Sequence, residues 1–294
     1  MLTWLADAWR RRWWREDRVA LAAYAGLRPM TVVTGASEGI GYALARRFAA
    51  AGHDLIMIAR RPELLEAAAT RIRAEHRVEA VTVAVDIASP EAIGNIEAVL
   101  ARHRAYADVL VNNAGIGLAG PFVSHSPEEI ERLLATNLRA LTRLMRHFLP
   151  GMRVRGRGGI LNLASIGSYT PGPYQAVYYA SKAYVLSLSE AVAVETAGEG
   201  VRITAVTPGP VSTNFHKRMG AERSLYRYFV APSSPESVAL ASYLGFVLGL
   251  RLVVPGILNP FTALAVRILP HRIVVPIVGW LLKPRGTEGR DAGR

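Results

Sequence analysis

Apolar runs of strand length alternate with segments of helical periodicity from Met30 onward. This alternation is typical of βαβ units, in which helices cover a parallel sheet. It predicts an α/β fold, namely a single doubly wound domain with a seven-stranded parallel sheet and helices on both faces. The expected strands are Thr31–Thr34, Asp54–Ala59, Ala80–Val85, Val109–Val111, Gly159–Leu163, Arg202–Val206 and Arg251–Val254.

Turn and capping residues punctuate this pattern. Gly52 ends a helix predicted over Gly39–Ala51, and Ser126 followed by Pro127 is typical of a helix start. Residues 212–235 show neither the helical nor the strand periodicity of apolar residues, which predicts an irregular lid between a strand and a helix. The aromatic residues of this lid either line an apolar pocket or pack the loop down; they are Phe215, Tyr226, Tyr228 and Phe229.

Extensions flank the predicted domain, which spans residues 30–256. Residues 1–29 are basic and rich in Trp, and residues 257–294 are apolar and basic. The apolar residues of the first extension share one helical face, which predicts a helix at a membrane interface; they are Leu2, Leu5, Trp9 and Trp13. Pro270 and Pro276 interrupt the C-terminal extension, so a surface-lying or pocket-covering hairpin is expected there rather than a transmembrane helix. Packing between subunits stays open as an alternative.

The formal net charge of +12 is concentrated in these extensions. Residues 1–28 contribute +3 (six Arg against three acids) and residues 251–294 contribute +5 (seven Arg and Lys against two acids), which leaves +4 for the rest. Basic termini that also carry Trp favour an acidic membrane surface as partner, and no motif for nucleic-acid recognition is present.

The chain contains no Cys, which excludes disulfides and thiolate metal sites. Its N-terminus fits a secretory leader poorly, because Glu16 and Asp17 interrupt the transition from basic to apolar residues. We therefore expect a cytoplasmic protein, with peripheral contact to a membrane surface through its termini as an open alternative.

A glycine-rich segment, Thr34 to Gly41, lies between the first predicted strand and the first predicted helix. Gly35, Gly39 and Gly41 allow a tight turn and let a dinucleotide pyrophosphate approach the backbone N–H groups of a helix N-terminus. This arrangement predicts a Rossmann-type domain, although its Gly-x3-Gly-x-Gly spacing differs from the better-known Gly-x-Gly-x-x-Gly fingerprint.

The end of the second predicted strand distinguishes the two nicotinamide cofactors. An acidic residue there binds the ribose hydroxyls of NAD, whereas Arg accommodates the 2′-phosphate of NADP. Arg60 and Arg61 occupy this place, so NADP(H) is predicted and NAD(H) is the less favoured alternative. Asp86 is placed to accept a hydrogen bond from the adenine amino group, and the segment from Asn112 to Gly115 is placed to wall the cofactor.

Tyr178 and Lys182 lie four residues apart, on one face of a predicted helix. Because the pKa of a Tyr is ordinarily about 10, its phenolate needs a nearby cation to take part in proton transfer at neutral pH. Ser165 follows the fifth strand, at the sheet edge where α/β folds bind ligands, and its hydroxyl can hold a substrate carbonyl. Asn137 is a weaker candidate, because an Asn inside a helix usually faces water or bonds locally.

Together these residues resemble the pattern of the short-chain dehydrogenase/reductase family, compact type, from Met30 to Gly256. The resemblance implies that Tyr178 transfers the proton, that Lys182 lowers the pKa of Tyr178 and binds ribose, and that Ser165 orients the carbonyl. It also implies that Asn137 holds a water in the proton relay. The cofactor-binding residues implied are Gly35, Ser37, Glu38, Gly39, Ile40, Gly41, Arg60, Arg61, Asp86, Ile87, Asn113, Ala114, Gly115, Tyr178, Lys182, Pro208, Gly209, Val211 and Thr213.

We therefore predict an NADP(H)-dependent oxidoreductase that interconverts a lipophilic ketone or aldehyde and an alcohol, as a homodimer or homotetramer without a metal. One alternative is a non-catalytic NADP(H)-binding sensor or scaffold of the same fold, which the presence of Ser165, Tyr178 and Lys182 disfavours. Another is an epimerase or dehydratase of the larger sugar-nucleotide branch. The glycine spacing and the lack of a sizeable C-terminal substrate domain disfavour this branch.

Overall fold

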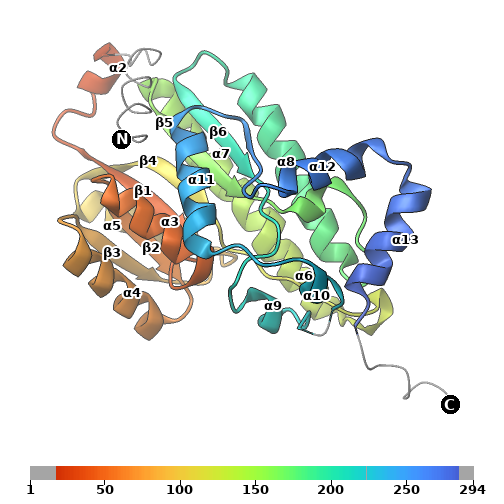
Figure 1. The fold of residues 1–294 in the computed structure, drawn as a ribbon. Coiled ribbons are helices and arrows are strands. Elements are labelled where there is room, and N and C mark those ends of the chain that lie inside the picture. Colours follow the sequence, from red (N-terminus) through yellow and green to blue (C-terminus); the bar gives the residue numbers. More distant parts are fainter. Residues whose placement is uncertain (1–17, 223, 285–294) are drawn as a thin grey trace.

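A seven-stranded parallel sheet forms the centre of the computed structural model, which describes residues 18–222 and 224–284. The strand order is β3-β2-β1-β4-β5-β6-β7 (Figure 1). The first three strands are therefore added toward one edge of the sheet and the next four toward the other, and this strand order reverses between β1 and β4. The predicted sheet is confirmed. Its strands are β1 (Arg28–Thr34), β2 (Asp54–Ala59), β3 (Ala80–Ala84), β4 (Ala105–Asn112), β5 (Gly158–Leu163), β6 (Val201–Val206) and β7 (Leu252–Val253).

Helices cover both faces of the sheet and bury a hydrophobic core against each. One face carries α3 (Gly39–Ala50), α4 (Pro62–Glu75) and α11 (Pro235–Val247). The opposite face carries α5 (Ala92–Arg102), α7 (Leu141–Arg155) and α8 (Ala176–Glu195). Shorter elements precede or connect these: α2 (Arg18–Ala22) before β1, η1 (Phe122–Ser124), α6 (Pro127–Leu134) and η2 (Ala135–Ala140) between β4 and α7, and η3 (Ile166–Tyr169) between β5 and α8.

Two strands, β1 and β4, begin three or more residues earlier than predicted, because paired charges allow polar residues inside them. In β4, Asp108 is 7% exposed and accepts hydrogen bonds from Arg157 at 3.0 and 3.2 Å. In β1, Arg28 forms ion pairs with Asp54 and Glu79 at 2.5 and 2.6 Å. The first strand therefore includes two residues that the sequence pattern assigned to the N-terminal extension.

The predicted helix boundaries agree well with the structure. Helix α3 ends at Ala50, and Gly52 follows with a φ of 84°, which suits a glycine. Ser126 and Glu129 form a capping box at the start of α6, with hydrogen bonds of 3.2 and 2.9 Å.

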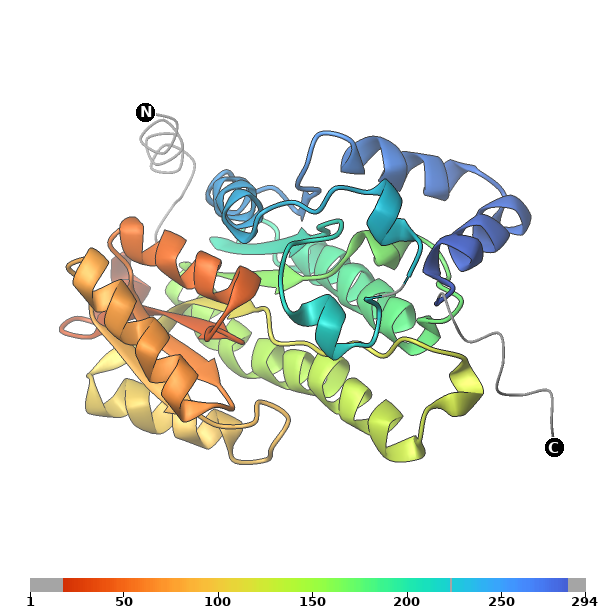
Figure 2. The ribbon, with the colours of Figure 1, turned by 60° about the horizontal axis from the view of Figure 1, so that its bottom comes forward.

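The lid, residues 212–235, is more regular than predicted, since it contains the short helices α9 (Phe215–Arg218) and α10 (Tyr226–Phe229). A bridge between Val211 and Ser233 closes its base. After β7 the chain forms the predicted hairpin from α12 (Asn259–Ile268) and α13 (His271–Leu282), which lies beside the lid in both views (Figures 1 and 2).

None of the helices in the described part of the chain has the length and apolar character needed to span a bilayer. The interfacial helix predicted around Leu2, Leu5, Trp9 and Trp13 lies outside the described residues.

Phe48 gives a direct test of the packing between α3, α11 and the sheet. Its side chain is 0% exposed and makes edge contacts with the rings of Tyr243 and Phe246. Phe48→Ala should lower the free energy of unfolding by about 3–5 kcal/mol, because the folded state loses the burial of the ring and its contacts and is left with a cavity. Chemical denaturation measures the loss. Val154→Ala, at a side chain that is 66% exposed, serves as the control and should change stability little.

Candidate active site

The glycine-rich loop is held to the end of β4 by the side chains of Thr34 and Asn113. The Thr34 hydroxyl donates to the carbonyl of Val111 at 3.2 Å and accepts from the backbone N–H groups of Asn113 and Ala114, each at 3.0 Å. In return, the Asn113 amide donates to the carbonyls of Thr34 and Gly35 at 2.9 and 3.2 Å. The carboxyl ends of β1 and β4 are therefore fixed together where the strand order reverses.

Two glycines of this loop are required by close contacts. Gly35 has a φ of 67°, and a Cβ there would lie 2.7 Å from the Asn113 amide nitrogen. A Cβ at Gly41 would lie 2.1 Å from the carbonyl oxygen of Gly35. Since no side chain caps α3, its first backbone N–H groups are available to an anion at the helix N-terminus.

A cleft of about 560 Å³ opens in front of this helix. It runs from the glycine loop across the ends of β2 and β3 to the segment after β4, which is the shape a dinucleotide needs. The predicted cofactor residues that line it are Gly35, Ser37, Glu38, Gly39, Ile40, Gly41, Arg60, Arg61, Asp86, Ile87, Asn113, Ala114, Gly115 and Thr213. A glycine floor, a helix N-terminus and two arginines thus fit a nicotinamide dinucleotide.

The charged groups of the cleft are engaged with one another. Glu38 accepts hydrogen bonds from Arg61 and Arg218, and also from Asn214 at 3.2 Å. Burial opposes ionisation of Glu38, but the hydrogen bonds from Arg218 and Asn214 outweigh it, so the pKa of Glu38 lies below its ordinary value. Glu38, predicted to bind cofactor, therefore ties the glycine loop to α9.

Asp86 stabilises the turn after β3 and lies near Arg60. Its Oδ1 accepts from the backbone N–H of Ala88 at 2.9 Å, as a turn residue does, while Oδ2 lies 3.9 Å from the guanidinium of Arg60. Both side chains still line the cleft.

Sequence reasoning missed Arg218, which the lid brings into the same cleft as Arg60 and Arg61. The only signal was a basic tripeptide, His216 to Arg218, inside a segment without periodicity. Its position depends on contacts between α9 and the segment after β4. The backbone N–H of Ala119 donates to the carbonyl of Met219 at 2.9 Å, and a Cβ at Gly117 would lie 2.9 Å from the Met219 side chain.

Ser165 and Tyr178 meet at the carboxyl end of β5. Ser165 begins η3, where its hydroxyl accepts from the backbone N–H of Gly167 at 3.1 Å, and it also hydrogen-bonds the phenol of Tyr178. Burial raises the pKa of Tyr178 to about 12, and the hydrogen bond to Ser165 offsets part of that rise. The phenol is therefore protonated at neutral pH.

Lys182 lies one helical turn beyond Tyr178 and is 6% exposed. Its ammonium donates to the carbonyl of Leu163 at 2.7 Å and lies 5.8 Å from the centre of the Tyr178 ring. Burial lowers the pKa of Lys182 to about 8. The expected acidification of Tyr178 by Lys182 is thus not seen in this structure, because burial has the larger effect and the ammonium is held by the strand end.

Asn137 does not face water, contrary to the expectation for an Asn inside a helix. It is 2% exposed within the π-helical turn η2, and its side chain exchanges two hydrogen bonds of 2.9 Å with the backbone of Ile116. Its amide also donates to the Ser181 hydroxyl at 3.0 Å, which in turn donates to the carbonyl of Tyr178 at 2.6 Å. In this structure Asn137 therefore supports α8 next to Tyr178.

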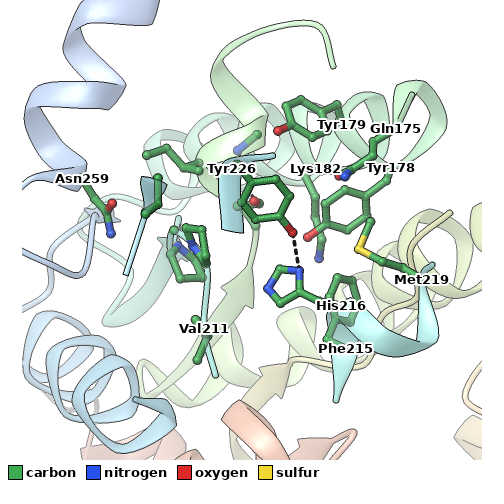
Figure 3. Close-up of a pocket in the computed structure, with 18 of the residues that line it drawn as sticks. Gln175, Tyr178, Tyr179, Lys182, Val211, Phe215, His216, Met219, Tyr226 and Asn259 are labelled. Carbon is green, nitrogen blue, oxygen red and sulfur yellow. Dashed lines mark hydrogen bonds between the residues drawn. The ribbon is translucent and has the colours of Figure 1, made fainter. Parts of the chain in front are cut away.

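A second cavity of about 270 Å³ adjoins the cleft and shares Gly115 and Thr213 with it. Ser165, Tyr178 and Lys182 line this cavity, as do the predicted cofactor residues Pro208, Gly209 and Val211. Figure 3 shows Tyr178 and Lys182 turned into it, opposite His216 and Tyr226 of the lid, which hydrogen-bond each other at 2.7 Å.

Two of the four lid aromatics take the predicted role of lining the pocket, and the other two are mostly exposed. Phe215 and Tyr226 line the cavity, whereas Tyr228 and Phe229 are 67% and 64% exposed. The ring of Phe215 lies 5.5 Å from that of Tyr178. Residues of both α12 and α13 close the far wall, so the hairpin covers the pocket as predicted.

Comparison with known proteins agrees with this geometry. The sequence pattern described as short chain dehydrogenase matches residues 29–224, about two thirds of the chain. The chain belongs to the short-chain dehydrogenase family. The matched residues run from β1 to the lid and include the glycine loop, Ser165, Tyr178 and Lys182.

Individual short-chain dehydrogenases resemble this one over different lengths. A short chain dehydrogenase of Pseudocercospora fijiensis is 36% identical over 185 residues, which make up 62% of this chain but only 59% of that relative. A short-chain dehydrogenase from Sphingobium yanoikuyae, solved in complex with NADPH, is 33% identical with a TM-score of 0.72, covering 81% of this chain and 92% of its own.

The 3-ketoacyl-(acyl-carrier-protein) reductase of Brucella melitensis, solved with NADH, is 29% identical to this short-chain dehydrogenase. The TM-score is 0.63, and the match covers 75% of this chain and 90% of the reductase. Similar structures thus hold either cofactor.

The buried ammonium of Lys182 should make the stability of this short-chain dehydrogenase depend on pH. Because the pKa of Lys182 is lowered from 10.5 to about 8 on folding, burial of the charged ammonium destabilises the folded state. This destabilisation has its full size below pH ~8 and disappears as the pH rises toward the pKa of the unfolded state. The free energy of unfolding of Lys182→Met minus that of wild type should therefore be smaller at pH ~9.5 than at pH ~7.5, by roughly 2 kcal/mol.

Urea denaturation without cofactor at the two pH values measures this difference. Lys217→Met, at an exposed residue of α9, controls for the loss of a lysine elsewhere. A difference between Lys182→Met and wild type that is constant with pH would show that Lys182 is not desolvated.

Proposed function

We propose that the protein is an NADP(H)-dependent oxidoreductase that interconverts a ketone or aldehyde and an alcohol, with Tyr178 as general acid/base. The observation that carries the proposal is the meeting of Ser165, Tyr178 and Lys182 in a cavity that adjoins the dinucleotide cleft. A carbonyl in this cavity faces one hydroxyl that orients it and one phenol that holds a proton.

The bound cofactor supplies the hydride that the chain itself lacks. Ser165 holds the substrate oxygen, and the protonated phenol of Tyr178 donates a hydrogen bond to it and then the proton. With its raised pKa, Tyr178 is protonated at neutral pH, which is the state that carbonyl reduction requires of the donor. Lys182, fixed by the Leu163 carbonyl, holds its ammonium one helical turn from Tyr178, and we assign it to binding the cofactor ribose, as the family resemblance implies.

The substrate is inferred to be lipophilic because apolar side chains dominate the cavity walls. The hairpin contributes Val266, Val278 and Leu281, and the lid contributes Phe215 and Met219. Polar groups stand beside Tyr178, from Ser165 and Lys182, and on α12, from Asn259 and Thr262, which suits a largely apolar molecule that carries polar groups.

NADP is inferred as the preferred cofactor because Arg60 and Arg61 line the cleft at the end of β2 and no acidic residue ends that strand. Arg218 also lines this cleft. Guanidinium groups at the end of β2 favour a 2′-phosphate over free ribose hydroxyls.

A homodimer or homotetramer is the assembly we propose, on the basis of the family resemblance. Size-exclusion chromatography with light scattering tests the assembly.

Tyr178→Phe should retain NADPH binding and lose turnover by about 10²–10⁴-fold, because the phenol oxygen that carries the proton is removed. NADPH oxidation with a panel of lipophilic ketones and aldehydes gives the rate, and fluorescence titration gives the affinity. Tyr184→Phe is the matched control, since Tyr184 is on the same helix but bonds Thr142 at 2.9 Å. A Tyr178→Phe enzyme with near-normal rate would rule out the assignment. Tight NADPH binding by wild type with no turnover on any carbonyl would favour the sensor or scaffold alternative.

Arg60→Ala combined with Arg61→Ala should weaken NADPH binding by about 100-fold or more and change NADH binding little, because two charged hydrogen bonds to phosphate, at roughly 1.5–3 kcal/mol each, are lost. Titration with both cofactors measures the ratio. Arg102→Ala, at an exposed residue of α5, is the control for lost charge. Equal losses for NADPH and NADH would contradict recognition of the 2′-phosphate by this pair.

A further inference from the structure

The hairpin of α12 and α13 exposes two apolar stripes at helical spacing. On α12 these are Phe261, Leu264 and Ile268, which are 69%, 57% and 71% exposed. On α13 they are Ile273, Ile277 and Trp280, which are 48%, 53% and 55% exposed. We call these six residues the outer face of the hairpin. Large apolar side chains that gather on one surface mark a contact site.

The opposite side of each helix lines the substrate cavity. Thr262 and Val266 of α12 and Val278 and Leu281 of α13 form part of the cavity wall, and Val274 is buried at 4% exposure. A surface helix needs only one apolar side to pack on its own domain. Both helices carry a second apolar side, which stays largely exposed in the described part of the chain.

Charge indicates what covers the outer face. Residues 251–284, all described, contain Arg251, Arg267, Arg272 and Lys283 and no Asp or Glu. Arg267 packs over the Tyr169 ring, whereas Arg272 and Lys283 lie at the two ends of α13. Apolar stripes flanked by cations match the boundary of an anionic lipid surface, where acyl chains meet negative headgroups. A second copy of the same face would bring like charges together, which disfavours self-association through it.

The lid continues this surface. Phe229 of α10 is 64% exposed, and its ring lies 5.8 Å from that of Trp280. A bridge between Ser224 and Pro284 joins the lid to the end of α13. Aromatic rings at the edge of an apolar surface, next to a Lys, are typical of residues that sit at the level of lipid headgroups.

We propose that the outer face of the hairpin docks on an anionic membrane surface. The apolar stripes enter the boundary between headgroups and acyl chains, while Arg272 and Lys283 contact lipid phosphates. Docking in this orientation puts the lid and the hairpin, which together close the substrate cavity, against the lipid. A lipophilic substrate can then pass between the bilayer and the cavity without crossing water. The docking itself does not depend on the proposed reaction.

Vesicle sedimentation of the full-length protein tests the proposal. Wild type should bind vesicles of phosphatidylcholine with phosphatidylglycerol more tightly than vesicles of phosphatidylcholine alone, and salt should weaken binding. The triple variant Ile273→Ser, Ile277→Ser and Trp280→Ser should lose affinity for the anionic vesicles by at least ~20-fold, because it removes apolar area from one whole stripe.

The matched control is Leu64→Ser, Val154→Ser and Val194→Ser, three apolar residues that are 45%, 66% and 58% exposed on α4, α7 and α8. It should bind vesicles like wild type. Circular dichroism and the midpoint of thermal unfolding verify that both triple variants fold, independently of catalysis.

Arg272→Gln with Lys283→Gln isolates the charge contribution and should weaken binding to anionic vesicles by about fivefold for each cation. Vesicle binding by the hairpin triple variant equal to that of wild type would overturn the proposal, as would a failure of wild type to bind. If light scattering showed that the hairpin variant dissociates an oligomer while vesicle binding is unchanged, the face would instead be covered by a second copy.

Discussion

The hydrogen bonds between Thr34 and Asn113 join the ends of β1 and β4, and the rest of the site depends on this connection. It fixes the glycine loop at the point where the strand order reverses, which is where α/β sheets open a crevice for ligands. Gly41 then places α3 within contact of the loop carbonyls, so the helix N-terminus faces the cleft. Cofactor cleft and substrate cavity share walls because both begin at this edge.

Burial is the dominant electrostatic effect at the catalytic centre. It raises the pKa of Tyr178 and lowers that of Lys182, so each group is shifted toward its neutral form. A protonated phenol suits a proton donor, whereas the reverse reaction needs a phenolate and hence additional positive charge near the ring. The tether from Lys182 to Leu163 and the support of α8 by Asn137 keep this pair in place without acidifying the phenol by themselves.

Much of the fold and of the cofactor cleft could be predicted from the sequence, because parallel strands and glycine turns leave local patterns. The starts of β1 and β4 could not, since Arg28 and Asp108 are accommodated by partners distant in sequence. The same holds for Arg218, whose place depends on packing of α9, and for Asn137, whose partners lie 21 and 44 residues away. Tertiary contacts, rather than local propensity, decided each of these positions.

The two-sided hairpin shows how the region beyond the sheet adapts a common fold to its substrate, since its inner side shapes the cavity around Tyr178 and its outer side remains apolar. The central claim is that this cavity carries out carbonyl reduction. Incubation of the enzyme with NADPH deuterated at C4 of the nicotinamide, together with a panel of lipophilic ketones, tests it most directly by mass spectrometry. The account predicts deuterium on the carbinol carbon of a product with wild type and its near absence with Tyr178→Phe. NADPH binding without label transfer to any carbonyl, or equal transfer by both proteins, would contradict it.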